Sequence, residues 1–231
     1  GDANRIMSHA NRDDAASTIK AVIFDVGGVL IRTHDWRGRQ RWERDLALQP
    51  GQAEWLVFHS QAGLRAQQGH ITGTRLWQEL AARLDLHDEQ LAAFRHDFWA
   101  GDALDEELVA YIRSLRPNYQ TAIISNFNDS LRDSLERTYP IAGDFDLIVV
   151  SAEENVMKPD ERIYHLTLER LGRQPGEAVF IDDSPANVAG ARAIGMHAVH
   201  YQAGMDVSAA LAALGVRPAD ESVDTNRSQE N

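Results

Sequence analysis

The sequence contains no cysteine in its 231 residues. This absence excludes disulfide bonds and thiolate-ligated metal sites, and it makes a cytoplasmic location our expectation. Long apolar runs are also missing: none approaches the roughly 20 residues of a membrane-spanning helix, so we predict no membrane span. Residues 1–18 contain no apolar segment, so we expect no secretory signal there. Their composition, like that of residues 216–231, predicts disordered tails.

Lysine is nearly absent as well. Arginine supplies all of the 23 basic residues except Lys20 and Lys158. Lys158 precedes a proline, and its retention indicates a site that needs a compact ammonium rather than a forked guanidinium. The formal net charge of −12 disfavours non-specific binding of nucleic acids or anionic membranes. It still allows a local site for a small anionic substrate.

Five apolar runs of strand length predict a sheet. They cover residues 21–25, 121–125, 146–151, 178–182 and 197–201. Helical patterns separate the later runs, and continuous apolar strands that alternate with helices are typical of a parallel sheet with helices on both faces. The sequence therefore predicts the α/β class.

Residues 34–100 break this alternation. The stretch has amphipathic helical patterns, such as TGTRLWQELAARL and DEQLAAFRHDFW, but no strand run. It predicts a small all-helical unit inserted after the first strand. We therefore divide the chain into an α/β core, residues 19–33 and 101–215, and this insert. We expect the tryptophans to form the core of the insert, while one or two could instead line a pocket. All five lie inside the insert: Trp36, Trp42, Trp55, Trp77 and Trp99.

Polar residues gather where the predicted strands end. In an open parallel sheet, ligands bind beyond the carboxyl ends of the strands. We expect one edge of the sheet to bring together a nucleophile candidate, a hydroxyl group, an ammonium group and two further carboxylates. The residues at or just after these ends are Asp25, Ser125, Asn126, Lys158, Asp182 and Asp183.

The charge balance at this edge indicates a metal ion. Three carboxylates contribute −3 and Lys158 returns +1, so the cluster would repel itself and any anionic ligand. A hard divalent ion relieves that repulsion, and Mg²⁺ suits one or two carboxylates plus a substrate phosphate. Ordinary roles stay open for some members. Ser125 and Asn126 could begin a turn, and Asp183 or Ser184 could cap the next helix.

Four motifs, in order, resemble the haloacid dehalogenase superfamily of hydrolases: VIFDVGGVL, AIISN, VMKPDERIY and AVFIDDSPANVAGARAIGMHAV. The resemblance covers most of residues 20–201. It implies a Rossmann-like parallel sheet with a cap domain, here of the helical type inserted after the first motif.

The same resemblance implies roles for the matching residues. Asp25 would be the nucleophile that forms an aspartyl-phosphate, and Lys158 would neutralise the nucleophile and the transferring oxygens. Ser125, the backbone of Asn126, and Gly28 would contact the phosphoryl group.

Gly27 departs from the pattern of the superfamily's phosphatases. The resemblance implies a Mg²⁺ site made by Asp25, Asp182, Asp183 and the backbone carbonyl of Gly27. Those phosphatases usually place a second aspartate at this position, as general acid for the leaving group and base for the attacking water. Sequences resembling FDxGGVL belong to a subgroup that includes sugar-phosphate phosphatases and the phosphatase domain of epoxide hydrolases. The glycine predicts a slow enzyme, one that favours good leaving groups, or one whose acid comes from elsewhere.

The implied function is Mg²⁺-dependent hydrolysis of a small phosphorylated metabolite. His34, Asp35 and Arg37 follow the first motif and could supply the missing acid, bind substrate or form a solvated linker. One alternative is a 2-haloacid dehalogenase, in which Asp25 attacks carbon without a metal; the two aspartates at 182–183 count against it. The other is a binding or regulatory protein with this fold and little turnover, which Gly27 motivates.

Overall fold

The computed structural model describes residues 18–219. The predicted disordered tails, residues 1–18 and 216–231, lie mostly outside this range, and their disorder stays a prediction. Val216, at the start of the second tail, is fully buried in the core. Among the described residues, no helix combines the length and the apolar character needed to cross a membrane.

Five parallel strands form one sheet, in the order β5-β4-β1-β6-β7. Each strand lies within one residue of a predicted apolar run at both ends, and the α/β class is confirmed. Because β1 pairs with β4 on one side and β6 on the other, the three strands that carry predicted site residues are neighbours. The strands are β1 (Ala21–Phe24), β4 (Gln120–Ser125), β5 (Leu147–Val150), β6 (Ala178–Asp182) and β7 (His197–His200).

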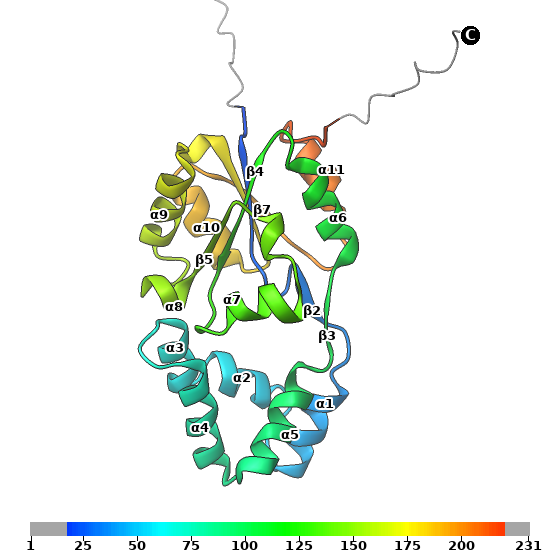
Figure 1. Cartoon of the computed structure of the whole chain (residues 1–231), viewed down its shortest axis with the longest axis vertical. Helices are drawn as coiled ribbons and strands as arrows, with labels where there is room; N and C mark the ends of the chain where they lie inside the picture. The colour runs from blue at the N-terminus through cyan, green and yellow to red at the C-terminus, as the bar shows by residue number, and fades with distance from the viewer. Residues whose placement is uncertain (1–17, 220–231) are drawn as a thin grey trace, which may run out of the picture.

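Helices cover both faces of the sheet (Figure 1). Val22 and Phe24 of β1 belong to one apolar cluster, and Ala21 and Ile23 to another, as the two-residue period of a strand requires. The first cluster packs under α6 (Glu106–Leu115), α7 (Leu131–Asp133) and α11 (Val207–Ala212). The second packs under α9 (Glu161–Leu171) and α10 (Pro185–Ala193).

Five helices between β2 and β3 lie together at one end of the sheet, and we call them the cap helices (Figure 1). Their own apolar core includes Trp77, Phe94 and Phe98. Trp36 and Trp55 are 43% and 46% exposed, so the expectation that the tryptophans form this core is wrong for these two. The cap helices are α1 (Arg37–Asp45), α2 (Gln52–Phe58), α3 (Gln61–Gln67), α4 (Gly73–Leu84) and α5 (Asp88–Trp99).

A two-stranded antiparallel ribbon joins the cap helices to the core. It consists of β2 (Ile31–Thr33) and β3 (Asp102–Leu104), and the sequence did not predict it. The short helix α8 (Ser151–Glu154) follows β5. Irregular turns complete the core: a π-helical turn at Ser134–Thr138 and 3₁₀ turns at Ala142–Asp144 and Pro175–Glu177.

Candidate active site

The carboxyl ends of β1, β4 and β6 meet at the edge of the sheet that the sequence predicts for the site. Phe24 pairs with Ile123 of β4 and Ile181 of β6. Asp25, the next residue of the chain, therefore lies beside the ends of both neighbouring strands. It is 7% exposed, and its Oδ1 accepts a hydrogen bond from the Val26 amide at 2.8 Å.

Lys158 is the centre of the cluster. Its ammonium nitrogen donates to Asp25 Oδ1 at 2.9 Å, Asp182 Oδ2 at 2.8 Å and the Ile124 carbonyl at 2.8 Å. These three contacts use all three ammonium hydrogens. Burial alone would lower the pKa of Lys158, but Asp25 and Asp182 raise it above its ordinary value. The compact ammonium that the sequence indicated is thus a buried, charged group.

Asn126 has a function that the sequence did not reveal. Its side-chain nitrogen donates to the Lys158 carbonyl at 3.0 Å, and its side-chain oxygen accepts from the Lys158 amide at 2.8 Å. The side chain therefore fixes the backbone of the lysine. Ser125 is 2% exposed and ends β4 beside this pair.

Asp25, Asp182 and Asp183 can each offer a carboxylate oxygen to one point, and these oxygens lie within 4.8 Å of one another. Asp182 is fully buried and also accepts from the Ser184 amide at 2.8 Å. Ser184 is the residue that caps α10, through the Asn187 amide. Asp183 is therefore not the helix cap, and the capping alternative does not account for it.

The cluster carries more negative charge than the protein neutralises. Burial raises the pKa of Asp25 to about 7; Lys158 opposes the shift and Asp182 adds to it. Burial and Asp182 also raise the pKa of Asp183. Grouped carboxylate oxygens with excess charge fit a hard divalent cation. The residues present thus suit the Mg²⁺ that the resemblance implies.

Asn187 belongs to the site, and the sequence did not single it out. Its side-chain nitrogen donates to Asp182 Oδ2 at 3.1 Å. The only sequence signal was its position in the first turn of the helix that follows Asp182 and Asp183, where a polar residue usually serves the helix end.

Residues 19–195 match the family model of haloacid dehalogenase-like hydrolases. The chain belongs to this family. The hydrolase is 26% identical to the sesquiterpene phosphatase astK of Aspergillus oryzae, over 80% of this chain and 90% of that protein. It is 24% identical to the (S)-2-haloacid dehalogenase 4A of Burkholderia cepacia, over 79% of this chain and 82% of that protein. Relatives with both activities match at similar identity, so the site residues must separate the two chemistries.

A solved structure of similar fold is the predicted HAD-like family hydrolase from Porphyromonas gingivalis. It has 27% identity and a TM-score of 0.71, and the match covers 87% of this chain and 99% of that chain. Some relatives are longer proteins. The chain spans 35% of the bifunctional epoxide hydrolase 2 of Sus scrofa and 38% of the drimenol cyclase drtB of Aspergillus calidoustus.

The two glycines that follow the hydrolase's first motif aspartate differ in what they tolerate. Gly28 has φ +80, and a Cβ there would lie 2.1 Å from Asp183 Oδ2, so the closeness of Asp183 requires glycine at this position. At Gly27 an added Cβ would meet nothing within 4 Å, and φ is not in the left-handed region. Position 27 therefore has room for a side chain and lacks one.

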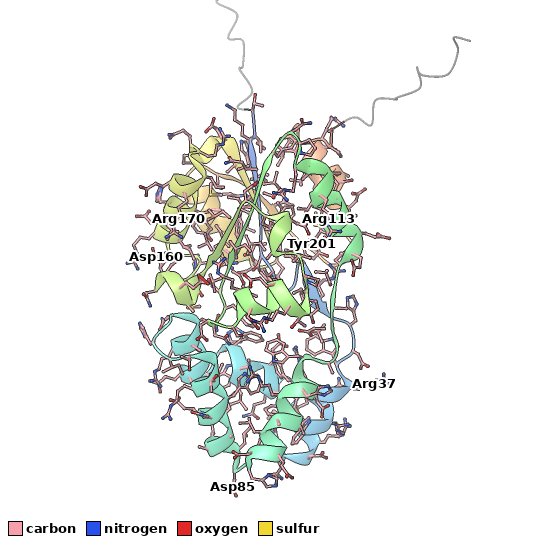
Figure 2. The ribbon with its side chains drawn as sticks, viewed as in Figure 1. Arg37, Asp85, Arg113, Asp160, Arg170 and Tyr201 are labelled. Atoms are coloured by element: carbon pink, nitrogen blue, oxygen red, sulfur yellow. The ribbon has the colours of Figure 1, made fainter. Side chains whose placement is uncertain are left out.

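Asp35 is paired with Arg37. Arg37 donates to its carboxylate from Nε, Nη2 and the backbone amide, at 2.6–3.1 Å. These hydrogen bonds lower the pKa of Asp35 to about 2, so it carries no proton to donate near neutral pH. Figure 2 shows Arg37, the first residue of α1, at the outer edge of the molecule. His34 contacts the Gly101 carbonyl through its backbone amide.

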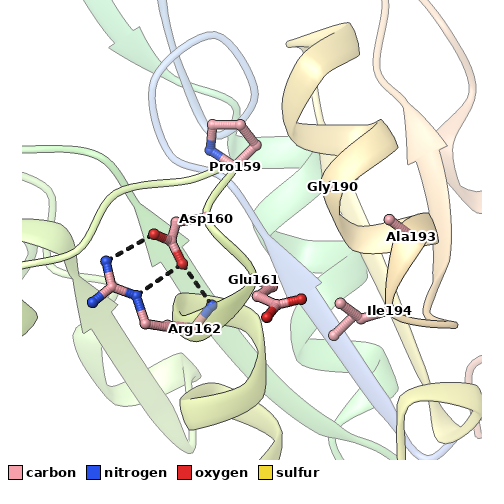
Figure 3. Close-up of a pocket in the computed structure, with 7 residues that line it drawn as sticks. All are labelled: Pro159, Asp160, Glu161, Arg162, Gly190, Ala193 and Ile194. Atoms are coloured by element: carbon pink, nitrogen blue, oxygen red, sulfur yellow. Dashed lines mark hydrogen bonds and ion pairs between the residues drawn. The ribbon is translucent and has the colours of Figure 1, made fainter.

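A separate hollow of about 560 Å³ lies next to Pro159, between the start of α9 and the end of α10 (Figure 3). Within it, Asp160 accepts hydrogen bonds from the Arg162 side chain and backbone at 2.8–3.0 Å. None of the predicted site residues lines it. The hollow is lined by Pro159, Asp160, Glu161, Arg162, Gly190, Ala193 and Ile194.

Proposed function

We propose that this hydrolase is a Mg²⁺-dependent phosphomonoesterase that forms a covalent phosphoryl intermediate on Asp25. The observation that carries the proposal is the meeting of the Asp25, Asp182 and Asp183 carboxylates, the first two of which bind the buried Lys158 ammonium. A cluster with this charge needs a cation, and a metal-bound phosphate ester is a suitable ligand for both the cation and Lys158.

The proposed reaction has two displacements at phosphorus. A carboxylate oxygen of Asp25 first bonds to phosphorus, the ester P–O bond breaks, and the departing oxygen takes up a proton. Water then attacks phosphorus, the bond to Asp25 breaks, and inorganic phosphate leaves. Lys158 orients Asp25 through Oδ1 and offsets its charge. Ser125 and the backbone of Gly28 are the proposed phosphoryl contacts, together with the backbone of Asn126.

Asp25, Asp182, Asp183 and the Gly27 carbonyl are the groups that would hold Mg²⁺. When bound, the ion would neutralise the carboxylates and the transferring phosphoryl oxygens. Asp182 shares its Oδ2 with Lys158 and Asn187, so its position is fixed from several sides. Asp183 is exposed at the edge of the cluster. Of the proposed ligands, it is therefore the one that solvent can reach.

The dehalogenase relative keeps a second function in view. In that chemistry Asp25 would displace a halide from carbon, with no need for a cation. Asp183 argues for the phosphatase, because an exposed carboxylate beside Asp25 would repel a haloacid carboxylate.

A substrate screen tests the proposal. Sugar phosphates, nucleotides, phospho-amino acids and p-nitrophenyl phosphate are incubated with the protein in Mg²⁺ or in EDTA, and released phosphate is measured. We expect hydrolysis that EDTA abolishes and Mg²⁺ restores. Parallel samples with 2-chloropropionate are assayed for chloride. Chloride release in EDTA without phosphate release would overturn the phosphatase assignment.

A further inference from the structure

The cap helices bind the core through a short segment, residues 67–73, which we call the docking segment. It lies beside α8, and Figure 1 shows α3, where the segment begins, next to α8. The Gln67 carbonyl accepts from Ser151 Oγ at 2.6 Å, and the Gln68 carbonyl accepts from the Asn155 side chain at 3.0 Å. At the other end, the Gly73 amide donates to the Asp129 carboxylate at 2.7 Å. On the cap side, all three bonds are made by backbone atoms.

Two glycines allow this close approach. A Cβ at Gly69 would lie 2.1 Å from the Ala152 carbonyl oxygen, and one at Gly73 would lie 2.8 Å from Asn128 Oδ1. Gly69 also has φ +76. At these two positions the docking segment meets the core without a side chain. A methyl group at Gly69 would collide with the Ala152 backbone, and one at Gly73 would require the Asn128 side chain to move.

Ser151 joins the docking segment to the loop that follows the site residue Ser125. It is fully buried, and its oxygen accepts from the Phe127 amide at 3.0 Å. Its hydroxyl has two acceptors in reach, the Gln67 carbonyl at 2.6 Å and the Phe127 carbonyl at 3.1 Å. A hydroxyl has one hydrogen to donate. The shorter bond goes to the docked segment, and if the segment leaves, the hydrogen has Phe127 as its remaining partner.

Phe127 has a second link to the cap helices. Its ring centroid lies 6.1 Å from that of Phe58 in α2 and 5.9 Å from that of Trp99 in α5. Its neighbour in the chain, Asn126, binds both the carbonyl and the amide of Lys158 through its side chain. The Asn126–Phe127 pair thus connects Lys158, at the centre of the site, with the docked cap helices.

We infer that Ser151 is a positioning residue that couples docking of the cap helices to the geometry of the loop around Asn126. The catalytic consequence rests on the proposed phosphatase function; the coupling itself does not. When the docking segment contacts the core, Ser151 Oγ accepts from the Phe127 amide and donates to the Gln67 carbonyl of the cap. When it does not, the Phe127 ring loses its contacts with Phe58 and Trp99, the Ser151 hydroxyl turns to the Phe127 carbonyl, and the loop shifts.

Three variants test the coupling. Ser151→Ala removes the bridging hydroxyl. Asn155→Gly removes the bond to the Gln68 carbonyl, suits the φ of +55 at this position, and leaves Ser151 and residues 125–128 unaltered. Thr167→Val is the matched control, because Thr167 is also fully buried and its hydroxyl donates to a backbone carbonyl, that of Ile163 at 2.7 Å, away from the cap. Hydrogen exchange is measured in residues 67–73 and 125–128, and kcat and KM are measured with p-nitrophenyl phosphate in Mg²⁺.

We expect Asn155→Gly to speed exchange in both segments, although it alters neither partner of the Phe127 amide. Ser151→Ala should do the same and lower kcat by roughly 10- to 100-fold with little change in KM, because the reacting groups are misplaced rather than removed. Thr167→Val should change neither segment nor kcat.

Faster exchange confined to residues 67–73 in Asn155→Gly would overturn the coupling. So would a Ser151→Ala protein with the kcat of the control variant. If the wild-type protein hydrolyses no phosphomonoester, the proposed function fails, and the exchange measurements still decide whether the coupling exists.

Discussion

At the scale of single residues, Asp25 is a buried acid held by Lys158 and by the Val26 amide. Asp25→Asn keeps the shape of the side chain and removes the nucleophile. We expect kcat for p-nitrophenyl phosphate to fall by roughly 10³-fold or more, with a circular dichroism spectrum like that of the wild type. Asp35→Asn, an exposed change near the same motif, is the control and should keep its kcat. Substantial turnover in pure Asp25→Asn protein would rule out Asp25 as the nucleophile.

We expect the missing carboxylate at Gly27 to make kcat depend strongly on the pKa of the leaving group. Without a carboxylate at this position, the departing oxygen must leave with little proton assistance. We expect a much higher kcat for p-nitrophenyl phosphate than for a sugar 6-phosphate, since phenolate leaves readily and an alkoxide does not. Equal kcat values, with chemistry rate-limiting, would show that another group donates the proton, and His34 would be the first to mutate.

The reverse substitution is a sharper test, because position 27 has free space around its missing Cβ. Gly27→Asp should raise kcat for the sugar phosphate, within the roughly 10²- to 10⁴-fold range of general acid catalysis, and leave the aryl ester nearly unchanged. Gly28→Asp is the contrasting variant. It should lower the thermal stability, because φ is +80 there and the side chain would collide with Asp183. No gain in Gly27→Asp with an intact fold would mean that leaving-group protonation does not limit the rate.

At the scale of elements, Asp182 and Asp183 lie where β6 ends and differ in their contacts. Asp182 binds Lys158, Ser184 and Asn187, so its removal would disturb the whole cluster. Asp183 is the better probe of the metal. Asp183→Asn should raise the Mg²⁺ concentration for half-maximal activity by roughly 10-fold or more, measured by titrating Mg²⁺ into EDTA-treated protein. Asp160→Asn, in the separate hollow, should leave that concentration unchanged, and an unchanged value in Asp183→Asn would remove Asp183 from the proposed site.

The sequence predicts the strands well because buried parallel strands are continuous apolar runs. It does not predict the β2–β3 ribbon, whose three-residue strands are too short to show a period. The convergence of Asp25, Lys158 and Asp182 was predictable, since parallel strand ends meet at one edge. The pair of hydrogen bonds between the Asn126 side chain and the Lys158 backbone was not predictable, because it depends on how two loops that are distant in the sequence approach each other.

The tryptophans show a similar limit for the cap helices. Composition indicates that a small helical unit needs large side chains in its core, and Trp77 meets that need at 2% exposure. Trp36 and Trp55 lie on the surface because helix faces are set by packing partners, which a single sequence does not contain. Ser151 was likewise invisible, since one serine after a strand has no distinctive pattern.

At the scale of the whole molecule, the charged cluster links stability to pH and to Mg²⁺. Burial raises the pKa of Asp25 from 3.8 to about 7, so the metal-free folded protein keeps a proton that the unfolded chain loses between about pH 4 and pH 7. The contribution of Asp25 to the free energy of unfolding therefore falls as the pH rises through this window. The proposed Mg²⁺ would bind the ionised form, so we expect it to raise the Tm more at pH 8 than at pH 5. An equal rise at both pH values would contradict this linkage.

The phosphoryl group on Asp25 is the central claim, and its detection is the most direct test. Gly27 also leaves the attacking water without a base, so the adduct should accumulate during turnover. The protein is mixed with p-nitrophenyl phosphate in Mg²⁺ or in EDTA, quenched in acid and digested, and the peptide that contains Asp25 is analysed by mass spectrometry. We predict a phosphoryl group on Asp25 in Mg²⁺ and none in EDTA or in Asp25→Asn. Steady hydrolysis in Mg²⁺ with no phosphoryl group on Asp25, or an adduct that forms equally in EDTA, would contradict the account.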